Sequence, residues 1–327
     1  MYNIRSLQEG EEEALYDLLA VSFTKGNEEI PSVRKIQKQI IESEPSFSHE
    51  LNRVIEVDGK LVARVGIYDR TMLFNKREFR IGAIGGVCTL PEYRGNGLAK
   101  ALLDDCTDYM RKNGFFASML FGEPAIYGRK GWQVLSSFGI SSNLKLPLPS
   151  TLRIRSADLK EDMAWLKYIY DDINSDLNGP FRRSKEYWEK WIFRKIIIRE
   201  SHNIKIVENK GQKLGYYVLK ADNTICEMGW DRNVADSFNE LIGAIFSEAE
   251  TETVNFIFFM QELFDFICNN SISPELDDMR DKKYYVSKDA IYCGLFKLID
   301  KTEIATTEEL ISLLRKNNYI FWDIDHF

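Results

Sequence analysis

An arginine and two glycines in the stretch GGVCTLPEYRGNGLAKALLDD, residues 85 to 105, have the clearest chemical meaning in the chain. Arg94 offers a fixed cation to a phosphate group. Gly95 and Gly97 allow a close backbone approach and a positive φ angle. The apolar spacing predicts a helix over residues 97–112. Its first N–H groups lack internal partners and carry the positive end of the helix dipole, so the loop predicts a diphosphate site.

The sequence excludes two other kinds of phosphate loop. The P-loop pattern G-x-x-x-x-G-K-[ST] is absent, and the dinucleotide pattern lacks its third glycine. Instead, R-G-N-G-L-A matches the [QR]-x-x-G-x-[GA] motif, and the chain thus resembles the GNAT superfamily of N-acetyltransferases. The alternative is a plain turn before a helix. The resemblance implies that acetyl-CoA is the co-substrate and that its pyrophosphate binds Arg94, Gly95, Asn96, Gly97, Leu98 and Ala99.

Two further segments resemble the enhanced-intracellular-survival (Eis-type) acetyltransferases. E-P-A-I-Y-G-R-K-G-W, residues 123–132, is similar to that family's E-G-G-I-Y-G-R-F-G-Y, and RRSKEYWEKWI, residues 182–192, is similar to its R-x-x-x-Y-W-x-W segment. The family has two GNAT-like domains and a smaller third domain. We therefore expect an α/β (α+β) fold with two GNAT-like domains, each a mixed, mostly antiparallel sheet flanked by helices.

The resemblance also implies roles for individual residues. Backbone groups of Val87, Cys88 and Thr89 would bind the pantetheine arm, although the Cys88 side chain itself is expected to pack as a small hydrophobe. Tyr127 matches the family's general-acid tyrosine, and a phenol with an ordinary pKa of ~10 can protonate a leaving thiolate. The alternative for Tyr127 is a half-buried ring that only packs a helix on the sheet.

The general base stays open among several groups. Eis-type enzymes use the terminal carboxylate, which here belongs to Phe327; Glu123, Glu28 and a water chain are alternatives. The expected reaction is direct attack of a primary amine on acetyl-CoA in a ternary complex, the amine being an amino sugar, a polyamine or a lysine side chain. The alternative function is a non-catalytic acyl-CoA-binding or regulatory module.

Three segments of the chain are expected from its length and its prolines. A chain of 327 residues exceeds what one core normally serves. LKLPLPSTLR, with Pro147 and Pro149, marks a boundary after which the order of strand, helices, sheet, helix and strand repeats. We assign residues 1–148 to the acetyl-CoA-binding catalytic domain, 149–300 to a second GNAT-like domain, and 301–327 to a tail that is either a third-domain remnant or part of the second domain.

Turn and strand patterns add local expectations. Asp58-Gly59 between alternating apolar residues predicts a hairpin. Residues 132–144 are interpreted as a strand pair. In the tail, Asp323 and Asp325 alternate with apolar residues, so they are expected on the solvent face of an edge strand or facing an amine.

Composition restricts the partners. The net charge of −7 and the lack of a dense basic run argue against a nucleic-acid partner. An acidic protein suits a small cationic amine, but net charge is only a weak guide to the substrate. Five cysteines without C-x-x-C indicate reduced thiols, and three scattered histidines predict no metal site. There is no signal peptide and no apolar run of membrane-spanning length, so we expect a cytoplasmic protein without membrane contact. The resemblance implies a homo-oligomer.

Overall fold

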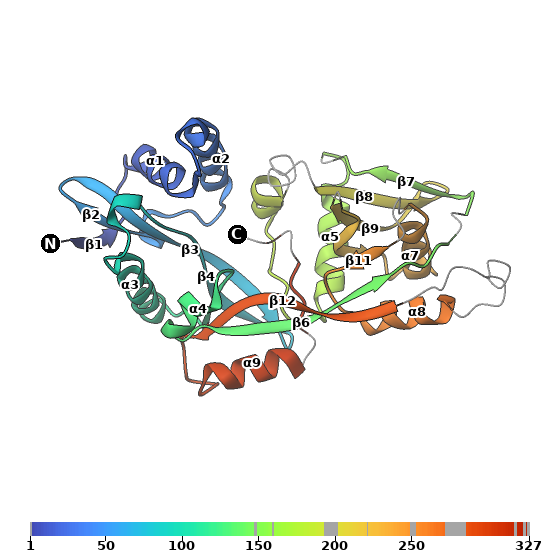
Figure 1. Cartoon of the computed structure of the whole chain (residues 1–327). Coiled ribbons are helices and arrows are strands. Elements are labelled where there is room, and N and C mark those ends of the chain that lie inside the picture. The colour runs from blue at the N-terminus through green and yellow to red at the C-terminus, as the bar shows by residue number, and fades with distance from the viewer. Residues whose placement is uncertain are drawn as a thin grey trace.

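The chain forms one continuous twelve-stranded sheet with helices on its faces (Figure 1). The structure, a computed structural model, describes residues 2–146, 149–158, 160–192, 202–220, 222–248, 253–271, 286–316, 319–322 and 325. The strand order is β1-β2-β3-β4-β5-β12-β6-β11-β10-β9-β8-β7. Two neighbouring pairs, β4 with β5 and β10 with β11, are parallel, and the others are antiparallel. The expected mixed, mostly antiparallel sheet is confirmed.

The first half of the chain supplies six strands. Its elements are β1 (Asn3–Ser6), α1 (Glu12–Phe23), the 3₁₀ turn η1 (Asn27–Glu29), α2 (Ile30–Ser43), β2 (Asn52–Val57), β3 (Lys60–Phe74), β4 (Arg77–Thr89), the 3₁₀ turn η3 (Pro91–Tyr93), α3 (Leu98–Lys112), β5 (Ala117–Leu120), α4 (Pro124–Tyr127), the 3₁₀ turn η4 (Gly128–Lys130) and β6 (Gln133–Ser142).

The second half repeats this order. Its elements are β7 (Leu152–Ser156), α5 (Met163–Asn174), a π-helical turn (Tyr187–Ile192), β8 (His202–Asn209), β9 (Gln212–Lys220), β10 (Thr224–Trp230), α7 (Ser237–Glu248), β11 (Val254–Phe256), α8 (Gln261–Ser271), β12 (Val286–Leu298) and α9 (Thr307–Lys316). No helix in the part of the chain that the structure describes is long and apolar enough to span a membrane.

Two tight turns connect the long antiparallel strands of the first half. The expected Asp58-Gly59 turn joins β2 to β3, and both residues have positive φ, at 50° and 78°. A second turn at Asn75-Lys76 joins β3 to β4, with φ of 49° and 59°. The sequence did not indicate the second turn because it has no glycine. Positive φ at both central residues gives the twist that a two-residue hairpin needs.

The two halves exchange their last strands. β6 pairs with β11 of the second half, β12 pairs with β5 of the first half, and β6 and β12 pair with each other. Figure 1 shows these two strands running side by side from one half to the other. The expectation of a strand pair within residues 132–144 is therefore wrong: this segment is a single strand, and its neighbour in the sheet comes from residues 286–298.

The exchange bears on the domain boundaries, which stay predictions. β12 belongs by position to the segment 149–300, yet it pairs with β5 over Ala117–Leu120. The tail joins the same region, because α9 packs on β6 and β12. Tyr319 and Phe321 share a buried cluster with Met72 of β3 and Phe296 of β12. The C-terminal end of the second segment and the tail thus both contact the first half.

A buried ionic cluster joins the second half to the tail. Arg183 is fully buried and donates to Glu227 at 3.0 and 2.5 Å and to Asp325 at 2.9 and 2.8 Å. Tyr216 donates to Glu227 at 2.7 Å, and Tyr187 donates to Asp325 at 3.1 Å. Asp325 is 1% exposed, so the expectation that it faces solvent or an amine is wrong. Asp323 lies outside the described residues.

The cluster gives a first prediction. Arg183→Met leaves two buried carboxylates without their cation, so the free energy of unfolding should fall by about 3–5 kcal/mol in urea titrations. Arg182→Met is the matched control, because Arg182 pairs with Glu78 at the surface, where the two side chains are 46% and 55% exposed. That variant should lose less than ~1 kcal/mol. Equal losses of unfolding free energy in the two variants would contradict the assignment of Arg183 to a stabilising buried cluster.

Candidate functional site

The first half has an opening in its sheet where β4 and β5 separate. Their parallel pairing runs from Ile81 opposite Ala117 to Ile84 opposite Leu120, where β5 ends. β4 continues to Thr89, still paired with β3 on its other side. The segment Val87–Thr89 therefore has its backbone free of β5, as a strand that binds an extended ligand requires. This is the segment in which the sequence analysis expected the pantetheine contacts.

A buried arginine shapes this part of β4. Arg64 of β3 is 2% exposed and donates to the carbonyl oxygens of Gly85 and Gly86 at 3.1 and 3.3 Å and to the Asn52 side chain at 2.6 and 3.1 Å. β4 has one extra residue here, and Gly86 has a φ of 57°. A Cβ on Gly86 would lie 1.8 Å from the Arg64 guanidinium. The bulge thus requires glycine, and the sequence analysis missed Arg64.

The loop from Arg94 to Gly97 leads directly into α3. Gly95 and Gly97 both have positive φ, at 82° and 75°, and a Cβ on either would meet nothing within 4 Å. The glycines are therefore needed for backbone conformation rather than for space. Gly97 is the N-cap of α3, and no side chain bonds to the first turn. The N–H groups of Leu98 and Ala99 are left to a ligand.

Arg94 is held in an extended pose beside this loop. Its guanidinium donates to the carbonyl oxygens of Thr89 and Ser22, both at 3.2 Å. It forms no ion pair with the described residues, so its charge is available to a phosphate group. Asn96 donates to the Tyr93 carbonyl at 3.1 Å and stabilises the turn.

A cavity of about 470 Å³ is lined by two of the nine expected cofactor residues and by the expected general acid. Val87 of β4, Ala99 of α3 and Tyr127 of α4 all line it. Three cations, which the sequence analysis did not single out, complete its wall: Lys100, Arg129 and Lys130. A ligand with an apolar arm and several phosphates therefore finds an open strand, free helix amides and positive charge at one place. The residues fit coenzyme A.

Tyr127 closes one end of this cavity. Its ring lies against Gly122 so closely that a Cβ there would be 2.4 Å from Cε2 of Tyr127. Burial of the ring, and then the nearby Tyr292 hydroxyl, raise the pKa of the Tyr127 phenol. The hydroxyl is therefore protonated at neutral pH and can donate a proton. By contrast, burial raises the pKa of Cys88 to about 11, so its thiol stays neutral and packs in the core.

Tyr292 of β12 also belongs to this site, and the sequence analysis missed it. Its hydroxyl donates to the Gly122 carbonyl at 3.0 Å and accepts from the Gly122 N–H at 3.4 Å. Burial, and to a smaller extent the Glu123 carboxylate, raise the pKa of the Tyr292 phenol. Glu123 is exposed at the N-cap of α4 and caps it through its carbonyl rather than its side chain. The strand exchange alone brings Tyr292 here.

Of the other two candidate residues, Glu28 lies outside the cavity and Phe327 lies outside the described residues. Glu28 is exposed in η1, between α1 and α2. Phe321, in the same tail as Phe327, packs on Phe121, the residue before Gly122, with ring centroids 5.1 Å apart.

The chain is similar to a known protein family and to several solved structures. The family model of the GNAT acetyltransferase domain matches residues 3–135. A probable N-acyltransferase from Enterococcus faecalis V583 has a similar structure, with a TM-score of 0.66 and 16% identity over 92% of this chain and 73% of that chain. A GCN5-related N-acetyltransferase from Kribbella flavida gives 0.62 and 15%, over 92% and 72%.

A third solved structure is Eis1 from Mycobacterium abscessus, with a TM-score of 0.60 and 13% identity over 92% of this chain and 74% of that chain. A search of curated proteins gave no match in sequence. The structural likeness covers both halves of the chain and concerns the fold, whereas the family match concerns the half that holds the cavity. Residues 3–135 therefore match a GNAT acetyltransferase domain, and this match supports an acyltransferase.

Proposed function

We propose that the protein transfers the acetyl group of acetyl-CoA to a primary amine by direct attack in a ternary complex. The observation that carries this proposal is the single cavity lined by Val87, Ala99 and Tyr127, which joins an open strand, a helix N-terminus and a protonated phenol. Amino sugars, polyamines and lysine side chains are the substrate classes that we infer from the Eis-type resemblance.

The chain's own residues divide the work of binding. Leu98 and Ala99 offer their N–H groups to the pyrophosphate, and Arg94 and Lys100 add positive charge. The backbone of Val87, Cys88 and Thr89 orients the pantetheine arm along β4. When it is bound, acetyl-CoA would supply a reactive thioester carbonyl near the end of β4.

Tyr127 then acts as general acid toward the departing thiolate. Because its pKa is raised by burial, it holds its proton through the neutral range. Glu123 attracts the cationic amine substrate, and the face of Tyr292 next to it can contact the same cation. The α-carboxylate of Phe327 is the candidate base, as the resemblance implies. Glu28 is a weaker substrate candidate because it lies outside the cavity.

Removal of the Tyr127 hydroxyl tests the acid. Tyr127→Phe should lower kcat by about 10²–10⁴ while the Kd of acetyl-CoA stays unchanged. Because the phenol acts when protonated and its pKa is raised, wild type should lose activity through deprotonation of Tyr127 only at a higher pH than an ordinary phenol would. Tyr109→Phe is the control, since its hydroxyl reaches Glu50 outside the cavity. If Tyr127→Phe keeps full turnover, Tyr127 is not the general acid, and only the binding of acetyl-CoA is left as a role for the site.

A pair of glycines at the two ends of α3 tests the cofactor loop. Gly97→Ala forces alanine into a left-handed conformation, which costs about 1–2 kcal/mol, and should weaken acetyl-CoA binding about 5–30-fold in titration calorimetry. Gly114 has a similar φ of 71° and equally open surroundings. Gly114→Ala should cost similar stability and leave the Kd of acetyl-CoA at the wild-type value. If both variants bind equally well, the pyrophosphate lies elsewhere.

Two changes separate the candidate carboxylates. Glu123→Gln should raise the KM of the amine about 3–10-fold with little effect on kcat, because a screened surface charge contributes about 1 kcal/mol. One glycine added after Phe327 moves the α-carboxylate by about 3.5 Å and should lower kcat more than about tenfold. Steady-state kinetics with an amine panel, followed by free-thiol release, measure both. A large loss of kcat in Glu123→Gln, together with an unchanged kcat in the chain extended by glycine, would make Glu123 the base.

A further inference from the structure

A second cavity lies at the other end of α3. Its volume is about 720 Å³, and it is bounded by Arg111 of α3, Lys297 of β12, Lys301 and Thr302 after β12, and Thr307 of α9. None of its lining residues belongs to the acetyl-CoA cavity. Because α3 has 15 residues, its two ends are roughly 22 Å apart. The proposed acetyl transfer gives this second cavity no role.

Lys297 is the unusual residue in this cavity. Its ammonium donates to Thr107 Oγ1 at 3.1 Å and lies 4.4 Å from the centre of the Trp132 ring. Thr107 can only accept this bond, because its own hydroxyl donates to the Leu103 carbonyl. Among the described residues, no carboxylate lies within ion-pair distance of Lys297. Burial lowers its pKa to about 8, and the nearby Asp104 and Asp108 carboxylates only partly offset this effect.

The charges around Lys297 leave an excess of cations. On α3, Arg111 pairs with Asp108 at the surface, and Asp104 is already bonded to Lys130 of η4. Lys301 is exposed and pairs with none of the described carboxylates. Across the cavity, the Asp300 carboxylate accepts the N–H of Thr302. Three cations, Arg111, Lys297 and Lys301, therefore share a cavity with one carboxylate.

We propose that this cavity binds a small, doubly charged oxyanion, either a free ion or the phosphate of a phosphate ester, with Lys297 as its main ligand. The half-buried ammonium supplies the charge that an incoming oxyanion can pair with directly, and a charge-assisted bond in a partly dry site is stronger than one at the surface. Arg111 and Lys301 enclose the anion from two other elements. Thr302 and Thr307 supply hydroxyl donors at the rim.

Calorimetric titration at constant ionic strength in chloride tests this site with sulfate, inorganic phosphate and glucose 6-phosphate. Wild type should show saturable binding of one ion per chain. Lys297→Met should weaken it about 10–100-fold, the value of a hydrogen bond to a charged group. This variant removes a desolvated charge and keeps the length of the side chain, so it should fold. Lys301→Met, on an exposed loop, should weaken binding about 2–5-fold.

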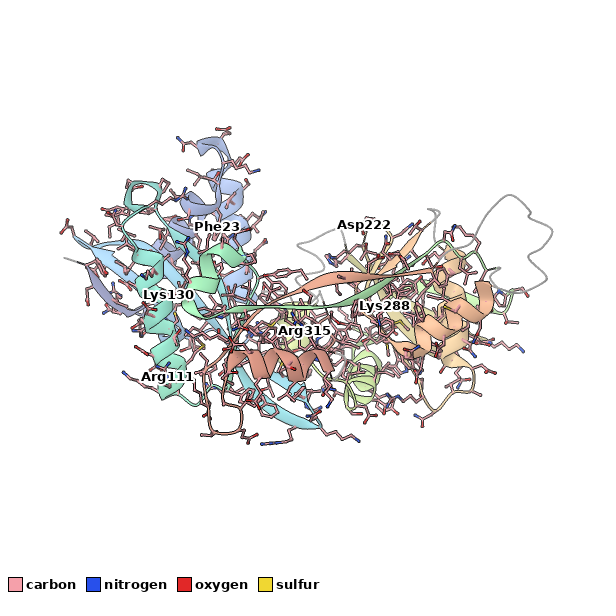
Figure 2. The ribbon with its side chains drawn as sticks, turned by 60° about the horizontal axis from the view of Figure 1, so that its bottom comes forward. Phe23, Arg111, Lys130, Asp222, Lys288 and Arg315 are labelled. Carbon is pink, nitrogen blue, oxygen red and sulfur yellow. The ribbon has the colours of Figure 1, made fainter. Side chains whose placement is uncertain are left out.

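Lys288→Met is the matched control. Lys288 is on the same strand, nine residues before Lys297, and Figure 2 shows it far from Arg111, in the other half of the molecule. This variant should bind like wild type. Similar affinities for sulfate and the ester support a site for a free ion, and a clear preference for glucose 6-phosphate supports one for a phosphate ester. Failure of all three anions to bind, or wild-type binding by Lys297→Met, overturns the proposal. Acetyl-CoA affinity should be unchanged in every variant, so failure here leaves the acetyltransferase proposal intact.

Discussion

The antiparallel pairing of β6 with β12 is the interaction on which the rest of the structure depends. Each strand completes the sheet of the opposite half: β12 pairs with β5, and β6 pairs with β11. Without this exchange β5 would be a four-residue edge strand with unpaired backbone groups. The same pairing forms the surface on which α9 packs, so the tail from residue 307 also depends on it. The sheet is one cooperative unit, although its strands come from two repeated segments.

The repeat allows the two halves to be compared where β4 and β10 end. Both halves have a parallel strand pair followed by an antiparallel strand, at β4–β5 and at β10–β11. In the first half, β4 carries Gly86 at a bulge and leads to a loop with two glycines. In the second half, β10 carries Glu227, whose carboxylate is neutralised by Arg183, and the loop 231–236 has no glycine. Arg183 also pairs with Asp325, so this ion cluster anchors the tail.

Local signals in the sequence predicted the positive φ angles of Gly95 and Gly97 and the start of α3, because these features depend on contiguous residues. A strand, an arginine, two glycines and an amphipathic helix lie within residues 85–112, and the short turn at Asp58-Gly59 is equally local. Arg64, Tyr292 and Arg183 were missed for the opposite reason. Each acts through partners far along the chain: Arg64 through Gly86, Tyr292 through Gly122, and Arg183 through Asp325, 142 residues away. Neither periodicity nor composition records such pairings. The prediction for the tail was wrong for a similar reason. Its alternating pattern is typical of an edge strand, whereas Asp325 is buried against a cation from another segment.

Tyr292 shows what the second half contributes to the chemistry of the first. It comes from β12, and its hydroxyl bonds to both backbone groups of Gly122, the residue that lies against the ring of Tyr127. The position of Tyr127 is therefore set partly by a strand that lies about 170 residues later in the chain. Gly122 has to be glycine for the ring to lie there, and Tyr292 holds that glycine in place. The segment 1–148 alone would lack this support as well as the partner of β5. The first half in the physical sense thus includes β12, so the proposed acetyl-CoA site depends on a strand that lies beyond residue 148.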